Sequence, residues 1–166
     1  MPSSPLFKIR LQGYVLAWIA LSLFSSGSAL GALGEREDSI EVDRKSLSGS
    51  HHTQAVYSGF SVHEIANDGV TIREYVSQNG VIFGIAWKGV IHPDLSTLLG
   101  SYSSEYQTVS KNSQYARARS ALGRRNYSET KSANVVVEKS GHMRALQGKA
   151  YLPSLIPEGM TPSDIQ

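Results

Sequence analysis

Apolar and polar residues alternate along Tyr57–Trp87. Two turn-forming pairs, Asp68-Gly69 and Asn79-Gly80, divide this segment into three runs. Both pairs tolerate the positive φ angles that a two-residue hairpin turn needs. The runs between them are rich in the β-branched and aromatic residues that favour strands. The pattern therefore predicts a three-stranded antiparallel meander at 57–87.

Counting outward from two-residue loops sets the register of this meander. His63 then faces Glu74, and Glu64 faces Arg73. Because side chains alternate between faces along a strand, the first pair lies on the apolar face and the second on the opposite face. The apolar face is completed by Ile65, Ile72, Val76, Phe83, Ile85 and Trp87. The opposite face also holds Phe60, Val62, Tyr75 and Ile82, with Gly84 beside Tyr75.

Asp94–Gln107 has the pattern of an amphipathic helix. Its apolar residues recur at the spacing of one helical face: Leu95, Leu98, Leu99, Tyr102 and Tyr106. Asp94, directly after Pro93, is expected to cap the helix, and Gly100 weakens its middle. We expect its apolar face to pack on the apolar face of the meander.

Two more strands are expected near the end of the chain, at Asn134–Lys139 and His142–Tyr151, with a turn at Ser140-Gly141. The predicted fold class is therefore α+β. An antiparallel sheet is built from the meander 57–87 and the hairpin 134–151, and one amphipathic helix near 94–107 packs on it.

The remaining segments are less regular. Glu35–Ser48 is charged and is expected to form a short helix capped by Asp38 or Ser39, with an edge strand at 40–42 as the alternative. Gly49–Gln54 is expected to be a loop. The polar stretch 108–133 is expected to be irregular, with a turn or two of helix at 114–122.

The first 29 residues have the pattern of a secretory signal peptide. Lys8 and Arg10 precede an apolar run at 14–24 that is too short for a comfortable membrane span, and small residues follow at 25–29. We expect cleavage after Ala29. Cleavage after Gly31 and retention as an uncleaved anchor are the alternatives. The sequence thus predicts one exported domain at 30–166, in the periplasm or outside the cell, with no membrane span after cleavage.

Removal of this leader changes the charge of the chain. The whole sequence has 16 Lys and Arg against 14 Asp and Glu, and losing Lys8 and Arg10 leaves 14 of each sign. A neutral chain argues against a nucleic-acid ligand. The sequence contains no cysteine, which excludes disulfides, thiol chemistry and a lipid-modified cysteine.

His63 opposite Glu74 is the one pair with a chemical mechanism. A carboxylate beside an imidazole raises the pKa of the histidine and orients it for acid–base catalysis. A structural ion pair that fixes the strand register is the plainer interpretation, and we favour it. The HEIAN sequence at His63 is no zinc-protease motif, because Asn67 stands where the second histidine is required.

Three groups of residues are candidates for binding. The basic segment 111–131 includes Arg117, Arg119, Arg124 and Arg125, and would suit an acidic surface. His142 and Arg144, two apart, are expected to share a strand face and to suit an anion. His51-His52 is expected to lie in a solvated loop without metal, since no Asp, Glu or Cys stands at ligand spacing. No cofactor motif is present.

Several longer segments together resemble a known family. They are VHEI at 62–65, DGVTIREYVS at 68–77, GVIFGIAW at 80–87, PDLSTLLGSY at 93–102 and VVVEKSGHMRALQGKAYLPSLIP at 135–157. The chain is similar to bacterial exported proteins that carry the domain of unknown function DUF2844, with a poor match at 111–133. The resemblance implies export and a single domain, and it implies no activity, cofactor or catalytic residue.

These observations favour a non-catalytic accessory or binding module of the bacterial envelope with a protein partner there. Two alternatives stay open. One is a small envelope hydrolase that uses His63 and Glu74. The other is a protein that binds acidic surfaces through 111–131.

Overall fold

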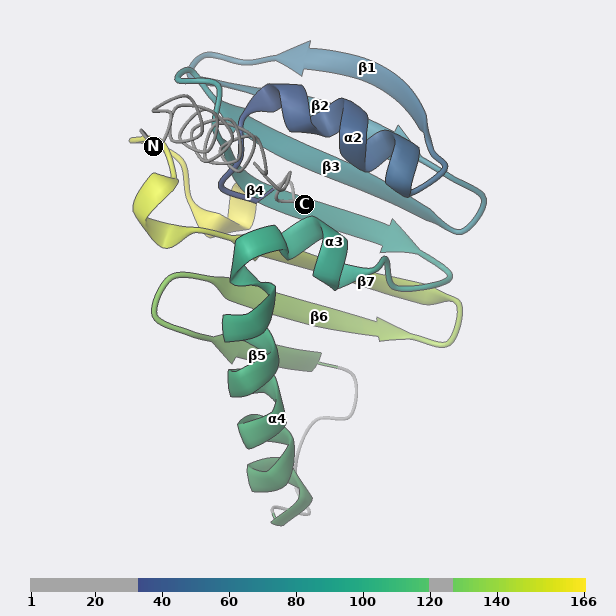
Figure 1. Ribbon diagram of the computed structural model, residues 1–166, viewed down its shortest axis with the longest axis vertical. Coiled ribbons are helices and arrows are strands. Elements are labelled where there is room, and N and C mark those ends of the chain that lie inside the picture. Colours follow the sequence, from purple (N-terminus) through teal and green to yellow (C-terminus); the bar gives the residue numbers. More distant parts are fainter. Residues whose placement is uncertain (1–32, 120–126) are drawn as a thin grey trace, which may run out of the picture.

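The protein is a mixed α/β structure with a seven-stranded antiparallel sheet (Figure 1). The computed structural model describes residues 33–119 and 127–166. In spatial order the strands are β1 (Ser50–Val56), β2 (Phe60–Ala66), β3 (Val70–Ser77), β4 (Ile82–Gly89), β7 (Ala145–Tyr151), β6 (Val136–His142) and β5 (Tyr127–Lys131). The last hairpin joins the meander through β4 and β7, which gives one continuous sheet.

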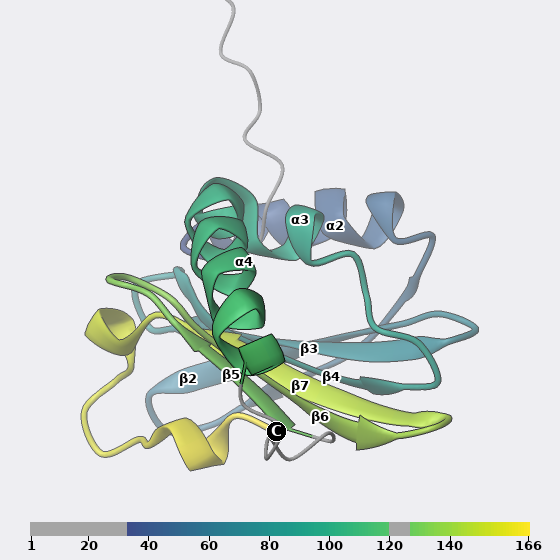
Figure 2. The ribbon, with the colours of Figure 1, turned by 90° about the horizontal axis from the view of Figure 1, so that it is seen from below.

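The helices lie on one face of the sheet. They are η3 (Glu37–Ser39), α2 (Ile40–Ser46), α3 (Leu95–Leu99), η4 (Gly100–Tyr102) and α4 (Ser103–Arg119). Residues 152–166, here called the tail, contain η5 (Pro153–Leu155) and η6 (Pro162–Asp164). The side chain of Leu152 packs in the cluster beneath the helices, and the chain then runs onto the opposite face (Figure 2). We call the two sides of the sheet the helix-covered face and the open face.

Each face has its own apolar cluster. The larger one lies between the helices and the sheet and includes Ile65, Ile72, Ile85, Trp87, Leu98, Leu99 and Tyr106. The smaller one lies under the tail and includes Tyr75, Phe83, Val136, Tyr151 and Ile165. Burying each such large side chain contributes about 1.5–3 kcal/mol. The expected packing of the 94–107 apolar face on the meander is confirmed.

Gly100 divides the predicted helix into α3 and α4. Asp94 caps α3 as expected, and its Oδ1 accepts a hydrogen bond of 2.9 Å from the Ser96 amide. Gly100 has φ +48°, which ends α3 there because glycine adopts the left-handed region without strain. The chain then continues as α4 as far as Arg119, so the expectation of an irregular segment is wrong for 108–113. The helical turn expected at 114–122 is present as far as Arg119, and 120–122 lie outside the described residues.

The first turn of the meander keeps the predicted register by a different mechanism. His63 pairs with Glu74 and Glu64 with Arg73, as counting predicted. Asp68 and Gly69 do not adopt positive φ, however. The Oδ1 atom of Asn67 accepts hydrogen bonds from the Gly69 amide (3.0 Å) and the Val70 amide (2.9 Å). An asparagine side chain that caps its own turn in this way replaces the expected type I′ geometry.

The second turn departs from the predicted two-residue loop. Its loop spans 78–80, with Gly80 at φ +71°, and the register shifts by one residue between Tyr75 and Val76. Val76 consequently pairs with Ile82 rather than with Phe83. The bulge moves Phe83 to the cluster on the open face and Ile82 to the helix-covered face, the reverse of the prediction. Gly84 lies beside Tyr75 as predicted.

Three other segments differ from the sequence prediction. Ser50–Val56 is strand β1 and not a loop, and Tyr127–Lys131 is strand β5. The last hairpin turns at 143–144, where Arg144 has φ +64°, and not at Ser140-Gly141. The turn lies later because β6 continues through Gly141, which stays paired with β7 despite its φ of +142°.

The helix predicted at 35–48 is present as η3 and α2. Ser39 stands at the N-cap position of α2, and its side chain makes no capping hydrogen bond. The segment ahead of α2 is tied to the sheet, since the Gly34 amide donates to the Ile82 carbonyl (2.8 Å) and the Ile82 amide donates to the Glu35 carbonyl (2.9 Å). No helix within residues 33–119 and 127–166 is long and apolar enough to cross a membrane.

Candidate functional site

His63 and Glu74 lie buried between the sheet and α2. Both face the helix-covered side, with 5% and 0% of their surface exposed. Asp43 of α2 also has no exposed surface and faces this region, so that its charge acts on Glu74. The carboxylate oxygens of Glu74 and Asp43 accept no hydrogen bond in the part of the chain that the structure describes. Unpaired carboxylates are costly to bury in the charged form.

The burial changes the pKa of both acids. Burial, reinforced by the charge of Asp43, raises the pKa of Glu74 from 4.5 to about 8. Burial and the charge of Glu35 raise the pKa of Asp43 from 3.8 to about 6. Glu74 therefore holds its proton at neutral pH, and the cluster avoids two adjacent buried negative charges.

His63 makes an ion-pair contact with Glu37 of η3. Its Nε2 atom lies 3.1 Å from Oε1 of Glu37, whose side chain is 47% exposed. The strand register confirms that His63 faces Glu74. The ion-pair contact of His63, however, is with Glu37. The arrangement can hold a proton near α2. Neither His63 nor Glu74 lines the three hollows of the open face or the hollow at Arg36, Glu37, Asp38 and Gly80. The last of these reaches the contact partner of His63.

A metal does not fit this cluster. Within residues 33–119 and 127–166 no three His, Asp or Glu side chains are arranged to hold a metal ion. Strand β1 carries His51 and His52, which pair with Ile65 and Glu64 of β2.

The open face presents the surface with the most chemical variety. Three hollows of about 520, 610 and 290 Å³ lie on it. All three are lined by Arg73 and Gln166, and the first and third also share Trp87 and Lys88. Because they share these residues, the three hollows adjoin one another in a row across the strands, from Ala55 and Tyr57 at the β1 end to Tyr127 of β5. We call this row the furrow.

The tail forms one wall of the furrow. The Tyr75 hydroxyl donates to the Gln166 carbonyl (2.7 Å), and the Gln166 amide donates to the same hydroxyl oxygen (3.0 Å). Lys149 Nζ donates to the Pro162 carbonyl (2.6 Å). Ile165 packs against Gly84, where a Cβ atom would come within 2.9 Å of its Cδ1. The bare backbone at Gly84 therefore lets the tail lie close to the sheet.

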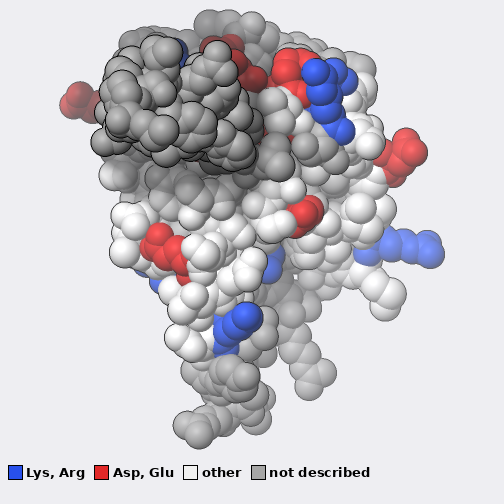
Figure 3. Space-filling view, viewed as in Figure 1, with Lys and Arg blue, Asp and Glu red and all other residues white. Residues whose placement is uncertain are grey.

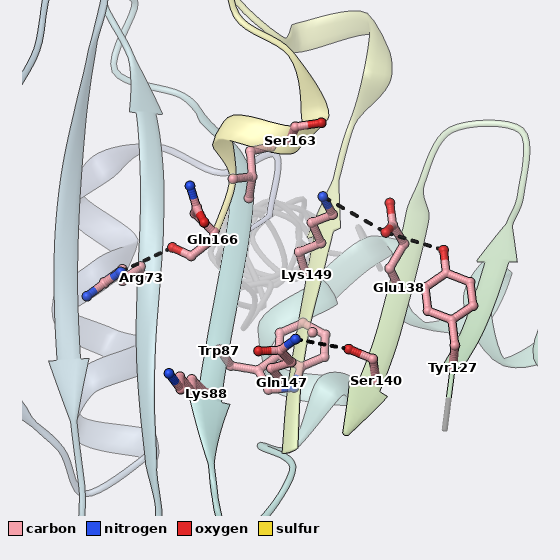
Figure 4. A pocket seen from close by; sticks show the side chains of 12 residues that line it. Arg73, Trp87, Lys88, Tyr127, Glu138, Ser140, Gln147, Lys149, Ser163 and Gln166 are labelled. Atoms are coloured by element: carbon pink, nitrogen blue, oxygen red, sulfur yellow. Dashed lines mark hydrogen bonds and ion pairs between the residues drawn. The ribbon is translucent and has the colours of Figure 1, made fainter. Parts of the chain in front are cut away.

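The charged residues of the furrow are mostly paired (Figure 4). Arg73 Nε donates to Glu64 (2.8 Å), as the register predicted. Lys149 Nζ lies 3.9 Å from Glu138, which also accepts from Tyr127 (3.4 Å). Lys88 has no ion-pair or hydrogen-bond partner among the described residues. Two of the cations in the furrow are thus paired with acids, and the ammonium group of Lys88 can bind a ligand.

Aromatic rings line the β1 end of the furrow. Tyr57 stacks on Phe60 with centroids 4.8 Å apart and ring planes 16° apart. Phe60 lies in turn 6.2 Å from Tyr75. Tyr57 is 55% exposed, so one ring surface remains available to a ligand.

The structure places the backbone of four of the six other predicted binding residues. Arg117 and Arg119 lie in the last turns of α4, and Arg124 and Arg125 lie outside the described residues. His142 ends β6 and Arg144 lies in the following turn, so the two do not share a strand face. On the helix-covered face, charged side chains of both signs are interspersed over the visible part (Figure 3). The sequence signal that identifies the furrow is the run of polar residues at alternate strand positions, such as Gln147 and Lys149.

The fold and the furrow define a small seven-stranded antiparallel α/β protein. The family model "Protein of unknown function (DUF2844)" matches residues 29–165, and the chain belongs to this family. Comparison with curated proteins and with solved structures finds no match.

Proposed function

We propose that this protein is an exported, non-catalytic binding module of the bacterial envelope, and that the furrow is its binding surface. One observation carries the proposal: a row of adjoining hollows crosses the open face of the sheet and combines aromatic, amide and charged side chains. Ligand sites are usually concave surfaces of this mixed lining.

Export is supported by the leader pattern at 1–29. The residues that match the family model, 29–165, begin where this leader ends. The proposed location is the periplasm or the cell exterior, and the partner is a component of the envelope.

The hydrolase alternative has less support from the geometry. His63 and Glu74 are buried under α2, and neither side chain lines the hollows described above. A general acid or base must lie within hydrogen-bond reach of its substrate. For the alternative of acidic-surface binding, 120–126 lies outside the described residues and no observation favours it.

Capture from the native envelope fraction tests the proposal. Immobilised wild-type protein is compared with the furrow variants Tyr57→Ala and Lys88→Ala, and with Lys111→Ala on α4 as a matched control on the other side of the sheet. We expect a component that both furrow variants lose and the control retains. Capture that is indifferent to the furrow, or turnover of an ester, peptide or glycoside that His63→Ala abolishes, contradicts the proposal.

A further inference from the structure

We infer that the furrow binds an uncharged glycan chain. The inference rests on the proposed function, because it takes the open face to be the binding surface. It is carried by the direction of the furrow, by the exposed rings at its two ends and by the pairing of its charges.

The furrow runs across the strands and not along an edge. Its lining comes from interior strands as well as from β1 and β5, and the backbone of the interior strands is paired in the ladder on both sides. An extended peptide that adds to a sheet needs the free backbone groups of an edge strand. A ligand in the furrow is therefore recognised by side chains.

The two ends of the furrow present ring surfaces. Tyr57 at the β1 end is 55% exposed, and Tyr127 at the β5 end is 46% exposed. The sheet has seven strands, so the distance between these ends is about 30 Å at the usual strand spacing. A chain of several rings spans that length. One face of a sugar ring carries mainly C–H groups, and this apolar face buries hydrophobic area against an aromatic ring.

The middle of the furrow supplies planar polar groups. Arg73, Gln147 and Gln166 line it, each with two or more hydrogen-bonding atoms in one plane. Such groups bind neighbouring hydroxyls as a pair. Gln147 Nε2 already donates to the Ser140 hydroxyl at 3.3 Å, which shows that hydroxyl groups fit this geometry (Figure 4).

The charge of the furrow favours an uncharged ligand. Three cations, Arg73, Lys88 and Lys149, stand against three acids, Glu64, Glu138 and Asp164. Four of these charges form two pairs, so a polyanion meets as much repulsion as attraction. Lys88 is then available as a donor to a glycan hydroxyl.

A glycan array probed with the purified exported protein tests the inference. The array contains uncharged glucans, N-acetylated amino-sugar polymers and acidic polysaccharides. We expect binding to uncharged members that is little changed by added salt, because no net charge is neutralised. Tyr57→Ala and Tyr127→Ala are each expected to weaken binding about fivefold, from the loss of an aromatic contact. Tyr57→Phe and Tyr127→Phe keep the ring and are expected to retain binding, as is Lys111→Ala.

Other outcomes overturn the inference. The first is that no member of the array binds the protein. The second is that only acidic members bind and that salt abolishes this binding. The third is that Tyr57→Ala and Tyr127→Ala bind as well as the wild type. If the array is silent while envelope capture still depends on Tyr57 and Lys88, the ligand is another class of molecule and the binding face stands. If capture is also indifferent to these residues, the proposed function fails as well.

Discussion

At the scale of single residues, Glu74 is the side chain whose surroundings conflict most with its charge. It is fully buried, and its oxygens have no hydrogen-bond partner among the described residues. Its pKa of about 8 means that it is mostly protonated at pH 7, while Asp43, with a pKa of about 6, is mostly ionised. The cluster under α2 therefore carries less negative charge at neutral pH than its composition indicates.

This protonation predicts that stability falls as the pH rises. Above pH 4.5 the unfolded chain releases the Glu74 proton, whereas the folded protein keeps it until about pH 8. The folded state is thus stabilised below the unfolded pKa, and this contribution is lost as the pH rises through the folded pKa. Asp43 acts in the same direction between 3.8 and about 6. Glu74→Gln removes the titration, and we expect it to be more stable than wild type at pH 8 by a few kcal/mol and similar at pH 4.

Denaturant midpoints from pH 4 to pH 8 measure this difference. Glu41→Gln, at a side chain of α2 that is 56% exposed, is the matched control. It should follow the wild-type curve apart from the small contribution of its exposed ion pair with Arg44. A Glu74→Gln curve that runs parallel to wild type at every pH would falsify the assignment of a proton to Glu74.

At the scale of elements, the turns set which strands pair, and the tail forms part of the surface of the open face. The β2–β3 turn is held by Asn67 and not by the Asp68-Gly69 pair that follows it. Asn67 Oδ1 accepts hydrogen bonds from two backbone amides, and Asn67 Nδ2 donates a hydrogen bond to the Leu47 carbonyl (3.2 Å). One asparagine therefore joins the turn to the end of α2.

Asn67→Ala is expected to cost about 1–2 kcal/mol, because it leaves part-buried backbone groups without their partner. Asp68→Ala removes an exposed side chain of the same turn and is expected to cost less than about 0.5 kcal/mol. Thermal or denaturant unfolding of the two variants side by side measures both values. Equal losses would mean that the turn depends on Asp68 as much as on Asn67.

Ile165 and Gln166 attach the last residues of the tail to the sheet. Ile165→Ala removes the side chain that packs on Gly84 under the tail. We expect amide hydrogen exchange to accelerate across 152–166, with the meander still protected, since large-to-small changes at buried sites cost about 2–4 kcal/mol. Leu155→Ala, at a 41% exposed position in the tail, is the control. Unchanged exchange in Ile165→Ala would show that the hydrogen bonds of Gln166 hold the tail without it.

At the scale of the whole molecule, the sequence predicted the strands wherever alternation and turns agreed. The register of β2 against β3 followed from counting, because the Asn67 turn has the predicted length. The same counting misplaced Phe83 and Ile82, because a bulge adds a residue that the hydrophobic pattern does not mark. Strand β1 was missed because Ser50–Val56 is polar and lies at an edge, where pairing with one neighbour decides the structure.

The candidate sites also contain features that local sequence patterns predict and features that they do not. The facing of His63 and Glu74 is a local consequence of register and was predictable. The electrostatic influence of Asp43 on Glu74 and the ion pair of Glu37 with His63 arise between the N-terminal helical segments and the sheet, and no local pattern specifies them. The furrow depends on five interior strands and the tail together, so it exists only in the assembled molecule.

Leu33, the first described residue, bears on where the predicted leader can be cut. Leu33 is fully buried, and its amide donates to the Leu98 carbonyl (3.1 Å). Cleavage beyond Leu33 would therefore remove a core residue, whereas cleavage after Ala29 or Gly31 keeps it. We expect the intact mass of protein from the envelope fraction to show loss of the first 29 residues. Signal cleavage needs a small residue just before the cut, so Ala29→Leu should accumulate precursor and Gly31→Leu should not. The reverse result places the cut after Gly31, and a full-length mass in the wild type means that the leader stays as an anchor.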